Sequence, residues 1–341
     1  MGQFTGQLVS LAAIVSVSLC GCDASRNYSE SKYTEGNQLA QDGQFEKAIE
    51  CFTEAIRSNP IHAEAYTSRA YVFNTRQEFS KAVVDSTEAI RIDPDLPEAF
   101  FNRGFAFAGL NELEKAIKDF DKSISINPND PLAYNERGKT HFKRGNNALA
   151  REDFSTAIKL NPNDADTFVN RQAVERALGN FQNVIADCSE AIRLQAGRNQ
   201  KLALAYNNRG HAYGILGDVE KAIADYTHAI AARPNWEVPY VNRGTSYESQ
   251  RNYELAILDY EYALRLNPKN PNALYGKGNS NGSLGRYTES IADFTSIIQL
   301  NPTDGMAYYA RGQSFRDAGK TAEAQADFAK ANELGFKPDG M

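Results

Sequence analysis

The sequence predicts an all-α solenoid built from nine stacked helix–turn–helix units, and two observations lead to this prediction. The first is a period, because the prolines that close successive units fall 34 residues apart except where a four-residue insertion lengthens the fifth unit. The second is that apolar and small residues recur at helical spacing within each period. A unit of this length cannot bury an apolar face alone, so neighbouring units must complete one another's core. The prolines are Pro60, Pro94, Pro128, Pro162, Pro234, Pro268 and Pro302.

The columns of the repeat indicate how the two helices of a unit pack. Position 4 is usually large and apolar (Tyr66), position 8 is usually small (Gly104), position 20 is usually alanine and position 24 is usually aromatic (Phe120). Small residues let the helices approach closely, and the rings fill the space beside them. Proline at position 32 ends the second helix, because it restricts the residue before it. The expected N-caps of the following helices include Asp130, Asp164 and Asn270. The units are expected at 29–62, 63–96, 97–130, 131–164, 165–202, 203–236, 237–270, 271–304 and 305–338.

Two charged columns indicate ion pairs inside the units. Position 7, on the packed side of the first helix, is Arg or Lys in eight units, and position 23 is Asp in the same eight. A half-buried guanidinium needs a carboxylate to offset its desolvation, so we expect a structural ion pair within each of these units. A ladder between units would leave Arg69 and Asp327 unpaired and is less favoured. The expected pairs include Arg103–Asp119, Arg209–Asp225 and Arg243–Asp259.

The columns at positions 4, 8, 11, 20, 24, 27 and 32 resemble the tetratricopeptide repeat, and the resemblance covers most of the chain. It implies a right-handed superhelix whose concave wall is built from the first helix of every unit. It also implies a scaffold that holds peptides or partner helices in that groove. Few members of the family are enzymes by virtue of their repeats. The charged position 7 departs from the family, where an aliphatic residue is usual.

Positions 2, 5, 6, 9, 12 and 13 of each first helix are expected to line the groove. Asparagine recurs at position 6, as Asn102, Asn170, Asn208 and Asn242. This column resembles the asparagine ladder with which some superhelical members grip a peptide backbone; alternatively, these side chains are simply hydrated. Aromatic residues at positions 5 and 9 are candidate anchors, or else ordinary packing between units. They are Tyr71, Phe101, Phe105, Tyr275 and Tyr309. Phe101 and Phe105, one turn apart, are the best candidates for a binding hot spot.

Several classes of function are disfavoured. The net charge is −6 and no run of five like charges occurs, so a nucleic-acid partner is not expected. The four histidines fall in four different columns of the repeat, and no phosphate-binding loop, nucleophile motif or zinc spacing appears. We therefore expect no catalytic site, no metal and no cofactor. Cys51 and Cys188 lie in different units and are expected to remain free thiols.

The N-terminus has features of an export signal. The apolar run Leu8–Leu19 is too short to span a bilayer but suits a signal-peptide core. Within Leu-Cys-Gly-Cys at 19–22, Cys22 resembles the acceptor cysteine of a bacterial lipoprotein. The resemblance implies a signal peptide over 1–21, a lipid on Cys22 and a short polar tether over 22–28, although residues 1–10 lack the usual Lys or Arg. The alternative is an ordinary export signal and a secreted protein.

The ends and the middle of the array can also be interpreted. Polar Gln325 and Asn332 occupy columns that are apolar in almost every other unit, which indicates a capping unit after which no further repeat stacks. Unit five matches the pattern least well, and Gln195–Leu202 replaces its tight turn. This predicts a seam between units one to five and six to nine, either a hinge or a longer loop.

Together these features predict a non-enzymatic scaffold that binds a protein or peptide in its concave groove and is anchored by lipid in the bacterial cell envelope. Two alternatives remain, a self-assembling structural protein and an accessory subunit of an envelope enzyme. The oligomeric state is left open.

Overall fold

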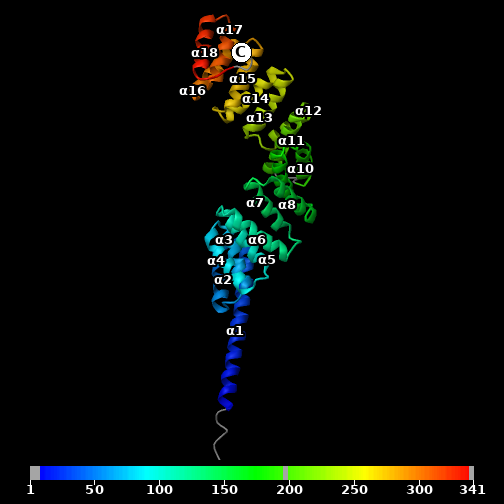
Figure 1. The fold of residues 1–341 in the computed structure, drawn as a ribbon, viewed down its shortest axis with the longest axis vertical. Helices are drawn as coiled ribbons and strands as arrows, with labels where there is room; N and C mark the ends of the chain where they lie inside the picture. Colours follow the sequence, from blue (N-terminus) through cyan, green and yellow to red (C-terminus); the bar gives the residue numbers. More distant parts are fainter. Residues whose placement is uncertain (1–7, 195–198, 338–341) are drawn as a thin grey trace, which may run out of the picture. The chain divides into compact units, whose positions relative to one another are not determined.

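The computed structural model describes residues 8–194 and 199–337, and side chains over 24–194 and 201–337. These residues form 18 helices and no strand, which confirms the predicted all-α repeat fold. By its contacts the chain divides into two compact units, residues 1–163 and 164–341, and each is described by itself (Figure 1).

The N-terminal compact unit holds the first four hairpins. Its helices are α1 (Leu8–Gln41), α2 (Phe45–Ser58), α3 (Ala63–Thr75), α4 (Phe79–Ile92), α5 (Pro97–Gly109), α6 (Leu113–Ile126), α7 (Pro131–Lys143) and α8 (Asn147–Leu160).

The C-terminal compact unit holds the other five hairpins. Its helices are α9 (Ala165–Ala177), α10 (Phe181–Leu194), α11 (Asn199–Ile215), α12 (Val219–Ala232), α13 (Glu237–Ser249), α14 (Tyr253–Leu266), α15 (Pro271–Ser283), α16 (Tyr287–Leu300), α17 (Gly305–Asp317) and α18 (Thr321–Glu333).

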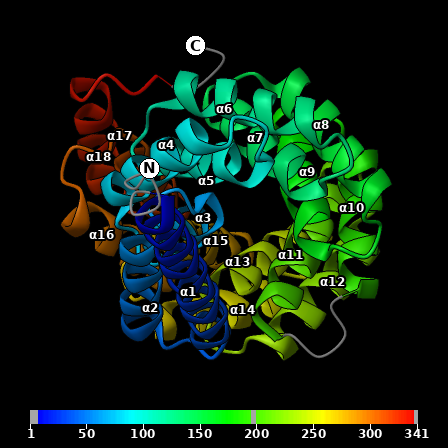
Figure 2. The same ribbon diagram turned by 90° about the horizontal axis from the view of Figure 1, so that it is seen from below.

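Within each compact unit the hairpins stack side by side. Each first helix packs against the second helix of its own hairpin and against the second helix of the hairpin before it, as α5 does with α6 and α4. Figure 2 shows α3, α5 and α7 on the inner side of the N-terminal unit, with α6 and α8 outside them. The C-terminal unit follows the same pattern, with α11 and α13 inside and α10 and α12 outside. The first helices therefore provide the surface that the sequence assigns to the groove.

The turn between the two helices of every hairpin contains one residue in the left-handed region, always at position 15. Six hairpins place glycine there, which adopts positive φ without steric cost. The other three place Gln77, Asn111 and Arg251 there, with φ of 61°, 64° and 61°. The tight turn thus depends on a backbone conformation that most side chains disfavour.

A ring at position 24 packs against a glycine at position 8 in seven of the nine hairpins. Phe120 is fully buried, and a Cβ added to Gly104 would lie 3.0 Å from its ring. The same arrangement joins Tyr226 to Gly210. The expected N-caps also form, since the side chain of Asp130 accepts a hydrogen bond from the backbone N–H of Leu132. The caps at Asp164 and Asn270 are likewise present.

The predicted seam after unit five is wrong in its position. The division between compact units falls between Asn163 and Asp164, before unit five. Across the insertion, α10 packs against α11 through Val184, Cys188 and Ala212. The four extra residues lengthen the connection without removing these apolar contacts, so the stack continues. Residues 195–198 lie outside the described part of the chain.

The first helix begins earlier than the expected start at residue 29. Residues 24–28, expected to be a tether, belong to α1 and contact α2. Ser25 Oγ donates to the carbonyl oxygen of Ser58 at 2.6 Å, and the Tyr28 hydroxyl donates to Glu54 at 2.9 Å. The side chain of Cys22 lies outside the described residues. No helix in the described part of the chain combines the length and apolarity needed to cross a bilayer.

Candidate binding grooves

Ion pairs between positions 7 and 23 are present in all eight predicted units. In unit three, Arg103 donates from Nε to Asp119 Oδ2 at 2.7 Å and from Nη2 to Asp119 Oδ1 at 2.8 Å. The aspartates are buried, so each fork-like pair is shielded from water. The other pairs are Arg69–Asp85, Arg137–Asp153, Arg171–Asp187, Arg209–Asp225, Arg243–Asp259, Lys277–Asp293 and Arg311–Asp327.

The third nitrogen of the guanidinium joins neighbouring units, which sequence reasoning missed. Arg69 Nη1 donates to Thr53 at 2.8 Å, and Arg137 Nη1 donates to Asp121 at 2.7 Å. Both acceptors stand at position 25 of the preceding unit. The signal was present in the sequence, because position 25 carries a hydroxyl or a carboxylate in every unit that another unit follows, and Ala329 in the last. One side chain therefore closes its own hairpin and fixes it to the one before.

These pairs are structural. Burial raises the pKa of Asp259 above its usual range although Arg243 opposes the shift, and the hydrogen bond to Asp259 raises the pKa of Arg243. Within the described residues no group of three or more His, Cys, Asp or Glu side chains could hold a metal ion. Cys51 and Cys188 are buried free thiols. The surfaces that remain for function are hollows along the first helices.

An apolar hollow lies along the first helices of the N-terminal compact unit, and we name it the N-terminal groove. It encloses about 500 Å³ between α1, α3, α5 and the start of α7. Tyr71 and Leu132 are 56 % and 58 % exposed beside it, and Phe101 is half-buried in its wall. Its lining residues are Asn37, Ala40, Gln41, Phe52, Thr67, Ser68, Tyr71, Pro97, Glu98, Phe101, Asn102, Asn127, Asp130 and Leu132. Most of these stand at the repeat positions that the sequence assigns to the groove.

A buried hydrogen-bond network supports this groove. Asn102 donates from Nδ2 to the carbonyl oxygen of Thr67 at 3.1 Å, and Asn74 donates to the carbonyl oxygen of Asn102 at 2.8 Å. Both links run between the first helices of units two and three, α3 and α5. They hold the two helices that carry Tyr71 and Phe101 at a fixed separation.

The asparagine column at position 6 therefore serves packing at several positions. Asn208 donates to Gln172 at 2.8 Å, and Asn242 donates to Asn207 at 3.0 Å, each across to the first helix of the preceding unit. Asn102 is buried, so its carboxamide is not presented on the surface. Asn170 also has an interaction partner. These contacts use one side-chain N–H of Asn102, Asn208 and Asn242 for packing between units, and the peptide ladder stays a prediction.

The predicted aromatic anchors divide into two groups. Tyr71 and Phe101 line the N-terminal groove, and Phe105 lies 6.5 Å from Phe101 by ring centroids and lines a separate hollow of about 210 Å³. Tyr275 and Tyr309 instead pack on aromatic rings of their own units, Tyr275 on Phe294 and Tyr309 on Phe328 and Phe336. These contacts lie within one unit, and Phe101 makes the corresponding contact with Phe120, whose ring centroid is 5.8 Å away.

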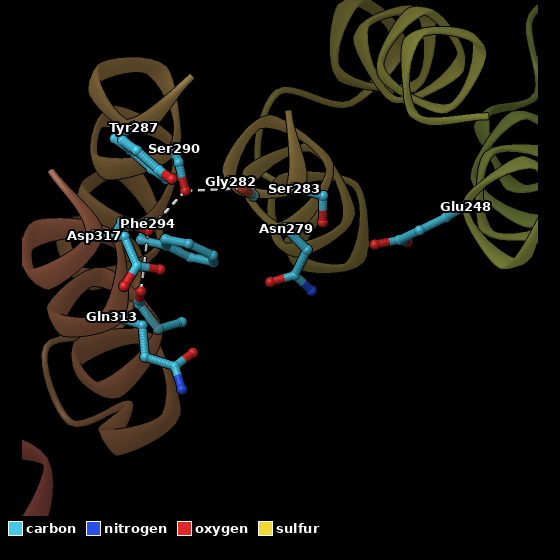
Figure 3. A pocket seen from close by; sticks show the side chains of 12 residues that line it. Glu248, Asn279, Gly282, Ser283, Tyr287, Ser290, Phe294, Gln313 and Asp317 are labelled. Carbon is cyan, nitrogen blue, oxygen red and sulfur yellow. Dashed lines mark hydrogen bonds between the residues drawn. The ribbon is translucent and has the colours of Figure 1, made fainter. Parts of the chain in front are cut away.

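A second hollow, the C-terminal groove, crosses α15 and encloses about 450 Å³ (Figure 3). Glu248 reaches it from α13 and Asp317 from α17, on opposite sides of Asn279. No candidate named from the sequence lies in its lining. Its lining residues are Glu248, Gly278, Asn279, Gly282, Ser283, Tyr287, Ser290, Phe294, Ala310, Gln313, Ser314 and Asp317.

Family models for the tetratricopeptide repeat match residues 33–97, 97–130, 131–164, 203–235 and 241–305, more than half of the chain. The chain belongs to the tetratricopeptide repeat family. Such repeats are generally non-catalytic scaffolds for protein–protein interaction, and this chain has the same repeat fold. No curated protein matches this chain.

Solved structures share the fold at low sequence identity. The C-terminal part of a tetratricopeptide repeat protein from Cytophaga hutchinsonii is 17 % identical with a TM-score of 0.59, covering 72 % of this chain and 98 % of its own. PilF from Pseudomonas aeruginosa is 17 % identical with a TM-score of 0.56, covering 67 % and 99 %. YrrB, described as having an unusual peptide-binding site, is 21 % identical with a TM-score of 0.52, covering 56 % and 97 %.

Proposed function

We propose that this protein is a non-enzymatic scaffold that binds an extended segment of a partner protein in the N-terminal groove. The observation that carries the proposal is the hollow of about 500 Å³ in which Tyr71, Phe101 and Leu132 converge from three successive first helices. Rigid aromatic side chains around a concave surface are typical of binding hot spots. The ion pairs and the network at Asn102 hold those helices in place before a partner arrives, which reduces the entropy lost on binding.

The lining also indicates the kind of segment that fits. Its apolar side chains suit an apolar anchor residue, and its charged members are Glu98 and Asp130, with no Lys or Arg among the lining residues. A partner segment with an apolar side chain next to a basic one would satisfy both features.

Site-specific photo-crosslinking tests this proposal. We expect a photoreactive residue in place of Tyr71 to crosslink one partner protein, and the Phe101→Ala substitution to abolish that adduct by weakening binding about tenfold or more. Val84, which is 68 % exposed on α4, is the matched control position and should give no such adduct. An adduct at Tyr71 that persists unchanged in Phe101→Ala would refute the proposal, as would an equal adduct at Val84.

We further propose that the scaffold is a lipoprotein of the cell envelope, anchored through Cys22. The apolar run Leu8–Leu19 followed by Leu-Cys-Gly-Cys supports this. The contacts of Ser25 and Tyr28 with α2 lie downstream of Cys22, so a chain that began at Cys22 would keep them. Because Ser25 already packs on α2, such an anchor would hold the first hairpin close to the membrane surface.

Membrane fractionation separates the anchored form from a secreted one. We expect Cys22→Ser to move the protein from the membrane to the soluble fraction, while Cys20→Ser leaves it membrane-bound. If both variants stay on the membrane, the lipid anchor at Cys22 is wrong. If the unmodified protein is soluble after export, the anchor is also wrong and the secreted alternative holds.

Self-association is a second candidate function, and one observation favours it. On α14, Leu255, Leu258, Tyr262 and Leu266 are exposed by 45 %, 52 %, 47 % and 40 % and follow helical spacing along one face. Unit seven is the only repeat with apolar residues at all four of these columns. In an antiparallel pair of α14 helices, the same apolar face of a second copy of the chain would cover this one.

Sedimentation of the purified chain decides this second candidate. We expect a concentration-dependent dimer that Leu258→Glu converts to a monomer, with Val84→Glu as an exposed apolar control that leaves the dimer intact. A monomer at every concentration up to about 100 µM would refute it, because such an interface would be too weak to matter.

A further inference from the structure

We propose that the C-terminal groove is a second recognition site, which binds a basic stretch of extended peptide across α15 with Glu248 and Asp317 contacting its cationic side chains. The proposal extends the scaffold function to a groove in the other compact unit and gives that groove a class of ligand. It rests on the proposed function only in its assumption that the ligand is a peptide.

Two glycines of α15, Gly278 and Gly282, lie in the lining of the groove, and most other first helices carry a side chain at the column of Gly282. Gly276 and Gly278 are required by packing, since an added Cβ would lie 2.2 Å from Tyr260 and 2.9 Å from Phe294. Gly282 is different, because an added Cβ would meet only Ser290 Oγ at 3.4 Å, an ordinary contact. A glycine inside a helix costs stability relative to alanine. Packing therefore does not require glycine at position 282. The absence of a side chain at Gly282 leaves the floor of the groove open.

The floor beneath the groove is fixed by hydrogen bonds. Ser290 replaces the alanine usual at position 20 and is fully buried. Its Oγ donates to the carbonyl oxygen of Gly278 at 2.8 Å and lies 2.8 Å from Ser314 Oγ. Figure 3 shows these links joining α15, α16 and α17 below the hollow. These hydrogen bonds therefore preform the part of the groove that units eight and nine contribute.

The charge of the groove selects cations. Its lining contains two carboxylates, Glu248 and Asp317, and no Lys or Arg. Asn279, Gln313 and Tyr287 add neutral hydrogen-bonding groups between and beside them. An extended peptide offers backbone amides to such groups and can place basic side chains at both ends of the hollow.

Glu248 lacks a counter-ion of its own. Its side chain is half-buried and accepts a hydrogen bond from the Tyr260 hydroxyl at 3.0 Å, but no Lys or Arg of the described residues forms an ion pair with it. Burial accordingly raises the pKa of Glu248. A desolvated carboxylate without a cation is unfavourable, so a cation from a ligand would be stabilised there. Asp317 is more exposed and forms an ion pair with its neighbour Arg316 at 3.0 Å.

The positions of the two carboxylates set the spacing of the ligand. They stand on α13 and α17, one first helix on either side of α15. Packed helices lie about 8–10 Å apart, so two steps cover roughly 16–20 Å. An extended chain rises about 3.3 Å per residue, which places the two cationic side chains about five or six residues apart.

Fluorescence anisotropy on the full chain tests this assignment. The probe is a labelled ten-residue Gly/Ser peptide with two lysines separated by five residues, and the reference peptide carries glutamines instead. We expect the lysine peptide to bind about tenfold more tightly. Glu248→Gln should weaken its binding about fivefold, and Asp317→Asn about twofold because that carboxylate is exposed. Gly282→Leu should block the groove, with circular dichroism confirming that the variant remains helical.

A matched control variant tests whether the loss of any surface carboxylate weakens binding of the lysine peptide. Glu289→Gln deletes one exposed carboxylate from α16, outside the groove, and should leave binding of the lysine peptide unchanged. Equal binding of the two peptides would overturn the inference, as would an equal effect of Glu289→Gln and Glu248→Gln. The result is independent of the Tyr71 crosslink, since Phe101→Ala lies in the other compact unit and should leave the lysine preference intact. Either proposal can therefore fail while the other stands.

Discussion

Removing Asp119 should reveal how much the repeated ion pair stabilises the stack. In the pair, the side chain of Arg103 is 21 % exposed and that of Asp119 is 9 % exposed. Deleting one partner of a buried pair costs about 3–5 kcal/mol, because the other charge is left desolvated. Arg103 keeps some access to water and a long contact with Thr87 at 3.4 Å, so we expect Asp119→Ala to cost about 2–3 kcal/mol. Replacing both residues by leucine should cost less than Asp119→Ala, because no unpaired charge remains.

Urea unfolding measures this difference, with hydrogen exchange of α5 and α6 as a local readout because repeat arrays need not unfold in one step. The control is Glu88→Gln, which breaks an exposed pair with Arg91 and should cost no more than about 0.5 kcal/mol. The reasoning about desolvation is wrong if Asp119→Ala lowers the free energy of unfolding no more than Glu88→Gln does. It is also wrong if the double leucine variant is the least stable of the set.

Three further substitutions test other parts of the fold. Phe120→Ala should lower the free energy of unfolding by about 3–5 kcal/mol through the cavity it leaves, and a loss below about 1 kcal/mol in urea unfolding would contradict the packing described. Arg251→Gly should stabilise the chain by about 0.5–1 kcal/mol because φ is 61° there, and a lower melting temperature would contradict this. Burial lowers the pKa of His141, so its contribution to stability is present above the unfolded pKa of about 6.5 and is lost as pH falls towards the folded value. His141→Phe should therefore lose less stability between pH 7.5 and 5.5 than the parent chain, and equal losses would show that His141 does not titrate differently on unfolding.

Much of the fold could be predicted from the sequence because each unit repeats the same residue types at the same positions. The expected starts of seven units coincide with helix starts, from Ala63 of α3 to Gly305 of α17. Proline after the second helix and a cap before the next fix these boundaries locally. The ion pairs at positions 7 and 23 were predictable for a similar reason, since a half-buried cation on one helix of a hairpin needs a carboxylate on the other.

The grooves were harder to predict, because they depend on which side chains are absent. Most residues that line the N-terminal groove stand at the predicted repeat positions, yet only Tyr71, Phe101 and Asn102 of the named candidates are among them. Asparagine at position 6 looks the same in sequence whether it faces solvent or bonds to the neighbouring helix. The C-terminal groove depends on the absence of a side chain at Gly282 of α15. A glycine within a helix has neither the apolar nor the charged side chain by which sequence analysis identifies a binding residue.

The position of the division between compact units was also hidden from the sequence. An insertion is conspicuous, and it suggested a break after unit five. Loop length, however, has little effect on whether the flanking helices pack, and Val184 and Cys188 keep α10 in contact with α11.

Removing one complete repeat tests the central claim most directly. If the chain is a stack of interchangeable units, deletion of residues 97–130 joins unit two to unit four in register, and Arg137 can then meet Thr87 in place of Asp121. We predict that circular dichroism will show unchanged helicity per residue and that unfolding will stay cooperative. Deletion of 97–113 alone removes the first helix of unit three and leaves its second helix without a partner. This variant should lose much of its helical structure. Equal loss of helix in both deletions would contradict the account, because it would mean that the residues depend on one shared core.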